Sequence, residues 1–261
     1  METIDLPEPG PDEALVRISH AGVNFPDKLV VEGKYQHKPA LPFVPGREIA
    51  GEVIGTGQAV MASVNFGGFA EAAVVPRHAL RPIPEGLSMA QAAAFSVATH
   101  TAYVALLERG QMTAGEVVLV LGAAGGVGLA TVQLAAALGA TVVAVASTEE
   151  KRQAALVAGA DHAIAPGEDL KERVQALTDG HGADIVFDPV GGDAFDAAIR
   201  TLAWDGRYLV IGFAAGRIPI LRVNRALIKG ISVIGVRAGE HVRQNPERGP
   251  VIREAIDALA A

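Results

Sequence analysis

The fold is decided by a stretch that begins Val117-Val118-Leu119-Val120-Leu121 and continues Gly122-Ala123-Ala124-Gly125-Gly126-Val127-Gly128. An alanine-rich segment follows as far as Leu138, and a second β-branched run spans Thr141 to Val145. An apolar run, a glycine turn, a helical segment and a second apolar run together predict a βαβ unit.

The glycine turn matches a nucleotide-binding fingerprint with Ala123 in the first position, followed by Gly125 and Gly128. Small residues allow a tight turn, close approach of a pyrophosphate, and close packing of the helix on its strand. The helix start also offers free N–H groups to phosphates. Because a strand precedes the turn and a helix and strand follow, dinucleotide binding is favoured over a buried turn without a ligand.

A membrane helix is an alternative for this region, since no charged residue lies between Glu116 and Glu149. The run changes its period, however, and Gln133 lies in the middle of the helical segment. A central parallel strand covered on both faces also gives continuous apolar sequence. The pattern therefore predicts a soluble core.

The choice of cofactor depends on the residues after the second strand, Ser147-Thr148, followed by Glu149-Glu150-Lys151-Arg152. NAD-binding proteins place an acidic residue in this region, on the ribose 2′-hydroxyl. A hydroxyl with two cations nearby favours a 2′-phosphate and therefore NADPH. Alternatively, Ser147 caps the next helix with Glu150 as its capping-box partner, and both functions can coexist.

Composition narrows the class of protein. The 261 residues carry a formal net charge of −7, which gives no support to nucleic-acid or membrane-surface binding. Cysteine is absent, so disulfides and thiolate metal ligands are excluded. Residues 1–5 lack the basic and apolar regions of a signal peptide. We therefore expect a cytoplasmic location.

The remaining chain indicates two domains. Short β-like runs (Ala14 to Ser19, Glu48 to Ile54 and Phe69 to Val75) predict a small antiparallel β domain over residues 1–86. Strands then alternate with helices over residues 87–261, which predicts an α/β fold with a doubly wound parallel sheet. Helices are expected over Ala194 to Leu202 and Pro246 to Ala261, among others, and a last strand over Ile231 to Val236.

Several motifs together resemble one family. They are Gly22-Val23-Asn24-Phe25-Pro26-Asp27, Gly33-Lys34-Tyr35, Leu41 to Gly51, Thr101-Ala102-Tyr103, Ala123 to Gly128, Asp188 to Gly192 and Ile211-Gly212-Phe213. The chain is similar to the zinc-free, zeta-crystallin-like quinone oxidoreductases of the medium-chain dehydrogenase/reductase superfamily. The resemblance implies a GroES-like β-barrel domain beside a Rossmann domain, with NADPH in the cleft between them.

The resemblance also implies roles for matching residues. Asn24 and Asp27 would lie near the nicotinamide and quinone, and Tyr35 near the substrate. The implied cofactor contacts are Thr101 for the nicotinamide, Gly125, Gly126 and Val127 for the pyrophosphate, Ser147 and Lys151 for the 2′-phosphate, and Phe213 by the nicotinamide ribose. Alternatively, these residues have structural roles only: Asn24 and Asp27 form a turn, and Tyr35 and Phe213 pack against neighbouring side chains.

No metal site is expected, because Gly46-Arg47-Glu48 has Arg where zinc alcohol dehydrogenases place a His ligand. A quinone has strong electron demand, so hydride transfer mainly requires proximity and orientation. The expected function is NADPH-dependent quinone reduction, by hydride or stepwise electron transfer. Alternatives are reduction of an enone or enoyl-CoA, or cofactor binding without catalysis.

The chain departs from the family in ways that affect the catalytic domain. Relatives usually have an extra strand before Met1, a longer connection between Gly57 and Met61, and further strands after Ala261. The catalytic domain therefore looks shortened. Pro166 stands where relatives often carry a 2′-phosphate-contacting Tyr. The segment Ile231 to Val236 matches the edge strand through which relatives dimerise, so a homodimer is expected.

Overall fold

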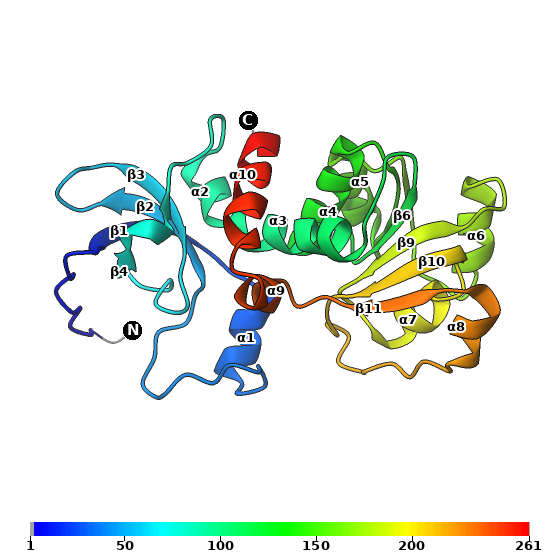
Figure 1. The fold of residues 1–261 in the computed structure, drawn as a ribbon, viewed down its shortest axis with the longest axis horizontal. Helices are drawn as coiled ribbons and strands as arrows, with labels where there is room; N and C mark the ends of the chain where they lie inside the picture. Colours follow the sequence, from blue (N-terminus) through cyan, green and yellow to red (C-terminus); the bar gives the residue numbers. More distant parts are fainter. Residues whose placement is uncertain (1–2, 261) are drawn as a thin grey trace. The chain divides into compact units, whose positions relative to one another are not determined.

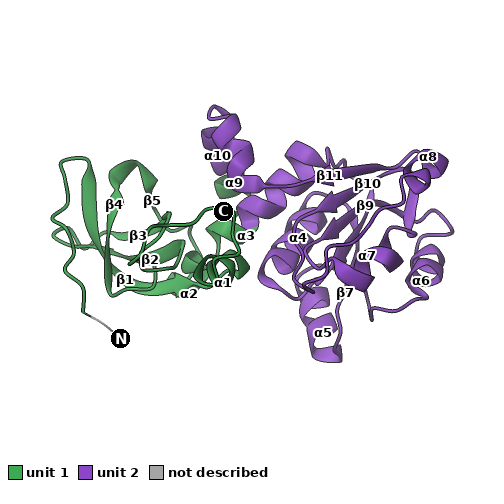
Figure 2. Cartoon of the chain, turned by 90° about the horizontal axis from the view of Figure 1, so that it is seen from below, with its two compact units in different colours: residues 1–98, 255–261 green, residues 99–254 purple. Residues whose placement is uncertain are grey.

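The computed structural model describes residues 3–260 and divides the chain into two compact units. The first comprises residues 1–98 and 255–261, and the second comprises residues 99–254 (Figure 2). The sequence pattern placed the boundary after residue 86, whereas the contacts in the fold divide the chain after Ala98.

The first unit is built on an antiparallel sheet with the strand order β4-β1-β2-β3-β5. The strands are β1 (Glu13–Gly22), β2 (Glu48–Val53), β3 (Ala59–Ser63), β4 (Ala72–Pro76) and β5 (Leu80–Arg81). The sheet forms a GroES-like half-barrel. Two short helices accompany it, α1 (Phe25–Val31) and α2 (Met89–Ala93).

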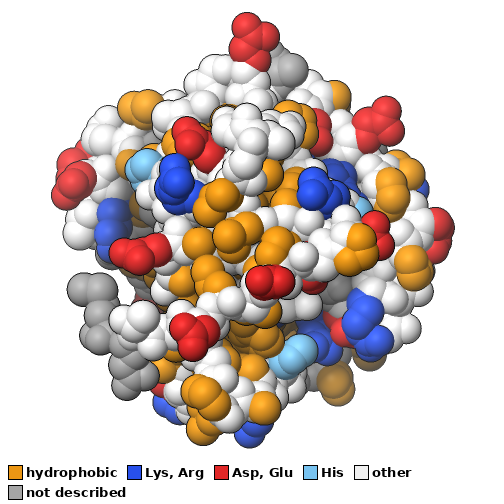
Figure 3. All heavy atoms as spheres, turned by 90° about the vertical axis from the view of Figure 1, so that its left-hand side faces the viewer, with side chains coloured by type: hydrophobic (Ala, Val, Ile, Leu, Met, Phe, Trp, Pro, Cys, Tyr) orange, Lys and Arg blue, Asp and Glu red, His pale blue; other side chains and the backbone are white. Residues whose placement is uncertain are grey.

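Alternation along the strands produces the core of this unit. Val16, Ile49 and Val75 are almost fully buried and belong to one cluster, while Ile18 and Leu80 pack against it half-buried. Figure 3 shows apolar side chains gathered on one face of the molecule, with charged side chains around them. The sheet thus places a hydrophobic layer inside the unit.

The second unit contains a parallel sheet with the order β11-β10-β9-β6-β7-β8 (Figure 1). Its strands are β6 (Val117–Leu121), β7 (Thr141–Val145), β8 (His162–Ile164), β9 (Ala183–Asp188), β10 (Leu202–Val210) and β11 (Ser232–Gly235). This is the six-stranded Rossmann arrangement expected from the alternation of strands and helices.

Helices connect and cover the strands. They are α3 (Ser96–Tyr103), continued by a π-helical segment (Val104–Arg109), α4 (Gly126–Ala137), α5 (Glu149–Val157), α6 (Leu170–Leu177), α7 (Gly192–Ala198), α8 (Asn224–Lys229), α9 (Ala238–Gln244) and α10 (Arg248–Ala260). All five residues of β6 are buried between its neighbours β9 and β7, so the charge-free stretch begins with a central strand of the sheet. Among the described helices, none has the length and apolar character needed to cross a membrane.

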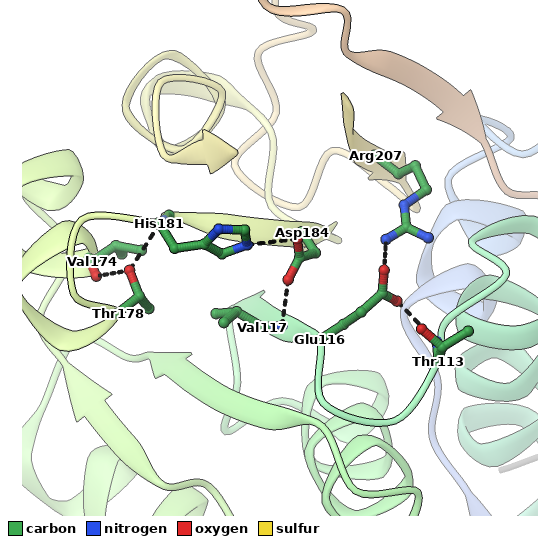
Figure 4. A network of polar contacts seen from close by, with 9 residues as sticks. Thr113, Glu116, Val117, Val174, Thr178, His181, Asp184 and Arg207 are labelled. Carbon is green, nitrogen blue, oxygen red and sulfur yellow. Dashed lines mark hydrogen bonds and ion pairs between the residues drawn. The ribbon is translucent and has the colours of Figure 1, made fainter. Parts of the chain in front are cut away.

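Side chains join the amino ends of the central strands (Figure 4). Asp184 accepts a hydrogen bond from the Val117 N–H at 2.8 Å and lies 2.8 Å from His181 Nε2. Glu116 forms an ion pair with Arg207 and accepts a hydrogen bond from the Thr113 N–H at 2.9 Å. These contacts link β6, β9 and β10 at the edge where they begin.

Two expected helices have different bounds in the structure, and one of them was partly wrong. The helix expected over 194–202 ends at Ala198, and Leu202 already begins β10. Asp205 adopts a left-handed conformation (φ 61°), and the pairing register of β10 shifts between Leu202 and Arg207. This irregularity hides the start of the strand in the sequence. The last expected helix is confirmed as α10, although it begins at Arg248 instead of Pro246, and α9 precedes it.

Candidate functional site

A cavity of about 370 Å³ lies at the carboxyl ends of β6 and β7. Its lining combines small, apolar and hydroxyl side chains with one cation: Leu121, Gly122, Ala124, Gly125, Val145, Ala146, Ser147, Lys151, Pro166, Val190 and Ala194. Ligands of doubly wound sheets bind at this edge of the sheet, outside the carboxyl ends of the strands. The cavity is therefore the first candidate for a cofactor site.

The turn after β6 is as tight as the fingerprint requires, but its key residue differs from the expected one. Gly122 has a φ of +59°, which side chains other than glycine rarely adopt, whereas Ala123 is fully buried behind it. A Cβ atom at Gly128 would lie only 2.3 Å from the Gly122 carbonyl oxygen. Gly122 thus makes the turn in place of Ala123, and Gly128 permits the helix to pack on the strand.

The beginning of α4 provides backbone donors beside the cavity. Gly125 is the N-cap residue, and Gly126, Val127 and Gly128 form the first turn of the helix. N–H groups of a first helical turn have no intrahelical acceptor, and the helix dipole makes this end positive. Gly125 lines the cavity, while Gly126 and Val127 do not. The three residues predicted to bind the pyrophosphate are therefore consecutive, with one of them in the cavity wall.

Ser147 and Lys151 lie together in the wall of the same cavity. The N-cap of α5 is Thr148, whose hydroxyl accepts the Lys151 N–H at 3.3 Å, so the alternative that Ser147 caps this helix was wrong. Arg152 turns away and donates to the carbonyl oxygens of Ala146 (3.1 Å) and Ser147 (3.3 Å). Lys151 is therefore the single charged residue in the cavity lining, and no carboxylate opposes it.

Asp188 organises the turn that borders the cavity from β9. It is 1% exposed and accepts hydrogen bonds from the N–H groups of Val190 (2.7 Å) and Gly191 (2.8 Å) and from the Tyr208 hydroxyl (2.8 Å). Burial raises the pKa of the Asp188 carboxyl, although these hydrogen bonds act in the opposite direction. Asp188 begins one of the motifs shared with the family, but no function was predicted for it.

The remaining predicted cofactor contacts lie outside the cavity lining. Thr101 is on α3, and Phe213 follows β10 with 37% of its surface exposed. Phe213 packs close to Gly191, since a Cβ atom at that glycine would lie 3.0 Å from the Phe213 ring. The turn held by Asp188 thus also positions Phe213. The roles of Thr101 and Phe213 remain predictions.

In the first unit, Asn24 links two buried carboxylates. Its backbone N–H donates to Asp27 at 2.8 Å, and its side-chain amide donates to Glu48 at 2.8 Å. Asp27 and Glu48 are 3% and 2% exposed, and burial raises the pKa of both carboxyls. Glu48 also accepts the N–H of Val97 at 2.9 Å. Within the described chain, Asp27 Oδ1 is buried without a hydrogen-bond partner.

Tyr35 lies close to the same group of residues through Arg47. The Arg47 guanidinium is 5.3 Å from the centre of the Tyr35 ring, and its charge lowers the pKa of Asp27 against the larger effect of burial. The structure therefore brings the predicted residues Asn24, Asp27 and Tyr35 together with two that were not predicted, Arg47 and Glu48. The Gly46-Arg47-Glu48 motif was the feature of the sequence that could have identified Arg47 and Glu48 as site residues. Asn24 also caps α1, so the turn-forming alternative applies to it as well.

Comparisons with known proteins agree with both units. Residues 10–85 match the alcohol dehydrogenase GroES-like domain, and residues 126–257 match the zinc-binding dehydrogenase family. Among residues 3–260, no group of three or more His, Cys, Asp or Glu side chains is arranged to hold a metal ion.

Individual relatives are more informative. The quinone oxidoreductase-like protein 2 homologue of Nematostella vectensis is 40% identical over 259 residues, covering 95% of this chain and 70% of that protein. A probable oxidoreductase from Mycobacterium abscessus has a TM-score of 0.86 at 38% identity, covering 98% of this chain and 81% of that one. The quinone oxidoreductase of Thermus thermophilus, solved also with NADPH, has a TM-score of 0.84 at 35% identity, covering 99% and 81%. The chain belongs to the quinone oxidoreductase-like proteins of the medium-chain dehydrogenase/reductase superfamily.

Proposed function

We propose that this protein is an NADPH-dependent oxidoreductase that reduces quinones by hydride or stepwise electron transfer, without a metal ion. The observation that supports this most strongly is the cavity beside β6 and β7, where Lys151 is the single charged lining residue. A cation without an opposing carboxylate suits the 2′-phosphate of NADPH better than the free ribose hydroxyls of NADH. The relatives solved with NADPH, from Thermus thermophilus and Escherichia coli, support the same cofactor.

The residues present fit such a cofactor. Added Cβ atoms at Gly122 and Gly128 would lie 3.0 Å from Val190 and 2.3 Å from the Gly122 carbonyl oxygen, so the turn has no room for larger side chains. The N–H groups at the start of α4 would hold the pyrophosphate, and Ser147 with Lys151 would hold the 2′-phosphate. When bound, the nicotinamide supplies the redox chemistry, while the protein binds and orients it.

The first unit offers residues suited to a planar apolar substrate. Phe25 (47% exposed) and Leu41 (84% exposed) present apolar surface in the same segments as Asn24 and Tyr35. In the proposed site, Asn24 and Tyr35 contact the substrate carbonyl, Asp27 holds Asn24 in position, and the apolar side chains exclude water. Orientation and desolvation are the contributions that an electron-deficient quinone requires from the protein.

The test is NADPH oxidation with a simple naphthoquinone, compared with NADH and with an enoyl-CoA. Lys151→Gln should raise the KM for NADPH about tenfold, by loss of one charge-assisted contact, and leave the KM for NADH nearly unchanged. Arg253→Gln, an exposed cation on α10, is the matched control and should change neither KM.

Three other results would change the conclusion. Turnover with the enoyl-CoA alone would establish an enoyl reductase instead. Tight NADPH binding without turnover of either substrate would indicate a cofactor-binding protein. Equal effects of Lys151→Gln on both cofactors would show that this residue does not contact a 2′-phosphate.

The proposal extends to a homodimer through β11. This strand is at the end of the sheet order, so one of its edges has no partner within the described chain. Val233 on β11 is 39% exposed, Trp204 on β10 is 75% exposed, and Leu227 on α8 is 83% exposed. An open edge with apolar side chains favours pairing with a second copy. Light scattering should give a dimer for the protein and a monomer for Val233→Asp, and a monomer for both would contradict this assembly.

A further inference from the structure

A second hollow, of about 270 Å³, lies in the Rossmann unit and shares no residue with the proposed cofactor cavity. Its lining consists of four cations and three isoleucines: Lys171, Arg200, Arg225, Lys229, Ile199, Ile228 and Ile231. Arg200 precedes β10, and Lys229 and Ile231 precede β11, so this hollow borders the amino ends of those strands. The cofactor cavity borders the carboxyl ends of β6 and β7, so the two belong to different parts of the unit.

The cations of this hollow are not neutralised by the protein. No aspartate or glutamate lines it, and within residues 3–260 none of the four cations forms an ion pair with a carboxylate. In contrast, Arg152, Arg173 and Arg207 in the same unit each pair with a carboxylate. A concentration of unpaired positive charge is notable on a chain with a net charge of −7. Such a concentration attracts an anion.

The Lys229 ammonium group is held by two hydrogen bonds and keeps one further N–H donor for a ligand. Its Nζ donates to the carbonyl oxygens of Arg200 (3.1 Å) and Leu202 (2.6 Å) at the beginning of β10. A lysine ammonium has three N–H donors, so one remains for a ligand. Burial and the charge of Lys171 lower the pKa of Lys229, and a bound anion would reverse part of this effect.

The other half of the lining is apolar. Ile199 and Ile231 are 2% and 6% exposed, and Ile228 adds an exposed apolar side chain at the opening. An inorganic anion would leave the Ile228 side chain, which is 68% exposed, in contact with water, whereas a ligand with a hydrocarbon portion would cover it. The volume is sufficient, because an apolar cavity of about 150 Å³ holds a benzene molecule.

We propose that this hollow binds an amphipathic carboxylate, with the carboxylate among Lys171, Arg200, Arg225 and Lys229 and a short hydrocarbon chain against the isoleucines. The proposal is independent of the cofactor and of the reaction assigned to the protein. Octanoate is a suitable probe, with octanol as the uncharged comparison and inorganic phosphate as the purely ionic one.

The experiment is calorimetric titration of the whole protein with each probe, with and without NADPH. Octanoate should bind saturably in both conditions, and octanol and phosphate should bind at least about tenfold more weakly, because each lacks one of the two kinds of contact. The double variant Lys171→Gln/Arg225→Gln should weaken octanoate binding about tenfold or more. Lys229 is left unchanged because its carbonyl contacts support the fold.

Arg222→Gln is the matched control, since Arg222 is an exposed cation near α8 that does not line the hollow. It should weaken octanoate binding by about twofold at most, because Arg222 lies one turn from Arg225 but outside the lining, where solvent screens its charge. Light scattering of each variant at the same concentration separates lost binding from altered assembly.

The proposal is overturned if octanoate shows no saturable binding at concentrations up to about 10 mM, because a dissociation constant above this value means negligible affinity. It is also overturned if octanol or phosphate binds as tightly as octanoate. Equal weakening by Arg222→Gln and by the double variant would likewise show that the hollow is not the binding site.

Discussion

The two ends of the Rossmann sheet differ in what holds them together. At the amino ends, side chains bind backbone groups: Asp184 accepts the Val117 N–H, and Asp161 accepts the Val142 N–H at 2.7 Å. At the carboxyl ends of β6 and β7, glycines make the turn and backbone N–H groups at the start of α4 are left without acceptors. Side chains thus bind the backbone groups at one end of the sheet, whereas at the other end backbone donors stay available for the cofactor that we propose.

This difference separates residues that stabilise the fold from residues that bind. Changes at the amino ends should affect the free energy of unfolding and leave cofactor affinity unchanged. At the carboxyl ends, some changes should lower the free energy of unfolding and others should lower cofactor affinity. The reason is that some glycines there allow close packing and others border the cavity.

The largest effect is expected at Gly128. Gly128→Ala places a methyl group 2.3 Å from the Gly122 carbonyl oxygen and 2.8 Å from the Ala123 Cα. The helix must move away from the strand, so the free energy of unfolding should fall by about 3 kcal/mol. Chemical denaturation monitored by circular dichroism measures this.

Gly126→Ala is the matched control, because a Cβ atom there meets no heavy atom within 4 Å. Alanine suits a helix, so stability should rise by about 0.5 kcal/mol, while NADPH affinity should decline if Gly126 contacts the pyrophosphate. A large loss of stability in Gly126→Ala would contradict the division between packing and binding glycines.

The next largest effect is expected at Asp188. Asp188→Ala leaves the N–H groups of Val190 and Gly191 and the fully buried Tyr208 hydroxyl without their acceptor. The free energy of unfolding should fall by about 2 kcal/mol, with a loss of NADPH affinity because the turn beside the cavity loosens. Asp188→Asn keeps one oxygen for the two N–H groups and should lose less than half as much. Similar losses for both variants would show that charge, rather than hydrogen bonding, holds the turn.

A smaller effect is expected at the amino ends. Asp184→Ala removes the acceptor of the Val117 N–H and the partner of His181, so the free energy of unfolding should fall by about 1.5 kcal/mol. The dissociation constant of NADPH, measured by its fluorescence, should stay within about twofold of the original value. A marked loss of NADPH affinity would contradict this separation, because it would show that the amino ends of the strands influence cofactor binding at the carboxyl ends.

The smallest effect concerns pH. Burial raises the pKa of Asp188 in the folded protein, so its contribution to stability is fully present below the unfolded pKa and is lost as pH rises through the folded pKa. Asp188→Asn removes this titration. The difference in unfolding free energy between the variant and the original protein should therefore shift in favour of the variant as pH rises from about 4 to 7. A constant difference across this range would mean that the Asp188 pKa is the same in the folded and unfolded states.

The sequence predicted the parts of the fold that have strong periodicity or strong turn residues. The strand-turn-helix-strand region from Val117 to Val145 is confirmed. Short elements were missed: β3 has five residues of mixed polarity, and α1 contains Pro26 in its first turn. Such segments carry too little pattern to distinguish them from loops.

The candidate site was predicted unevenly for a related reason. Residues adjacent in sequence, such as Gly125 and Ser147 beside their strands, follow from local pattern and topology. The hydrogen bond from Asn24 to Glu48 joins residues 24 positions apart, and Asp188 accepts a hydrogen bond from Tyr208, 20 positions later. These contacts arise from tertiary folding, which periodicity does not encode. The role of Gly122 was missed because the fingerprint was aligned on Ala123.

Trp204 has a practical consequence. It is the one tryptophan of the sequence, it is 75% exposed, and its indole lies beside Gly230, ahead of β11. The intrinsic fluorescence of the protein therefore reports on a single location, the region next to the open edge of the Rossmann sheet. Covering that edge should move the emission to shorter wavelength, because the indole leaves water. Dilution of the native protein should move it back. The chain thus carries its own optical probe of assembly and needs no added label.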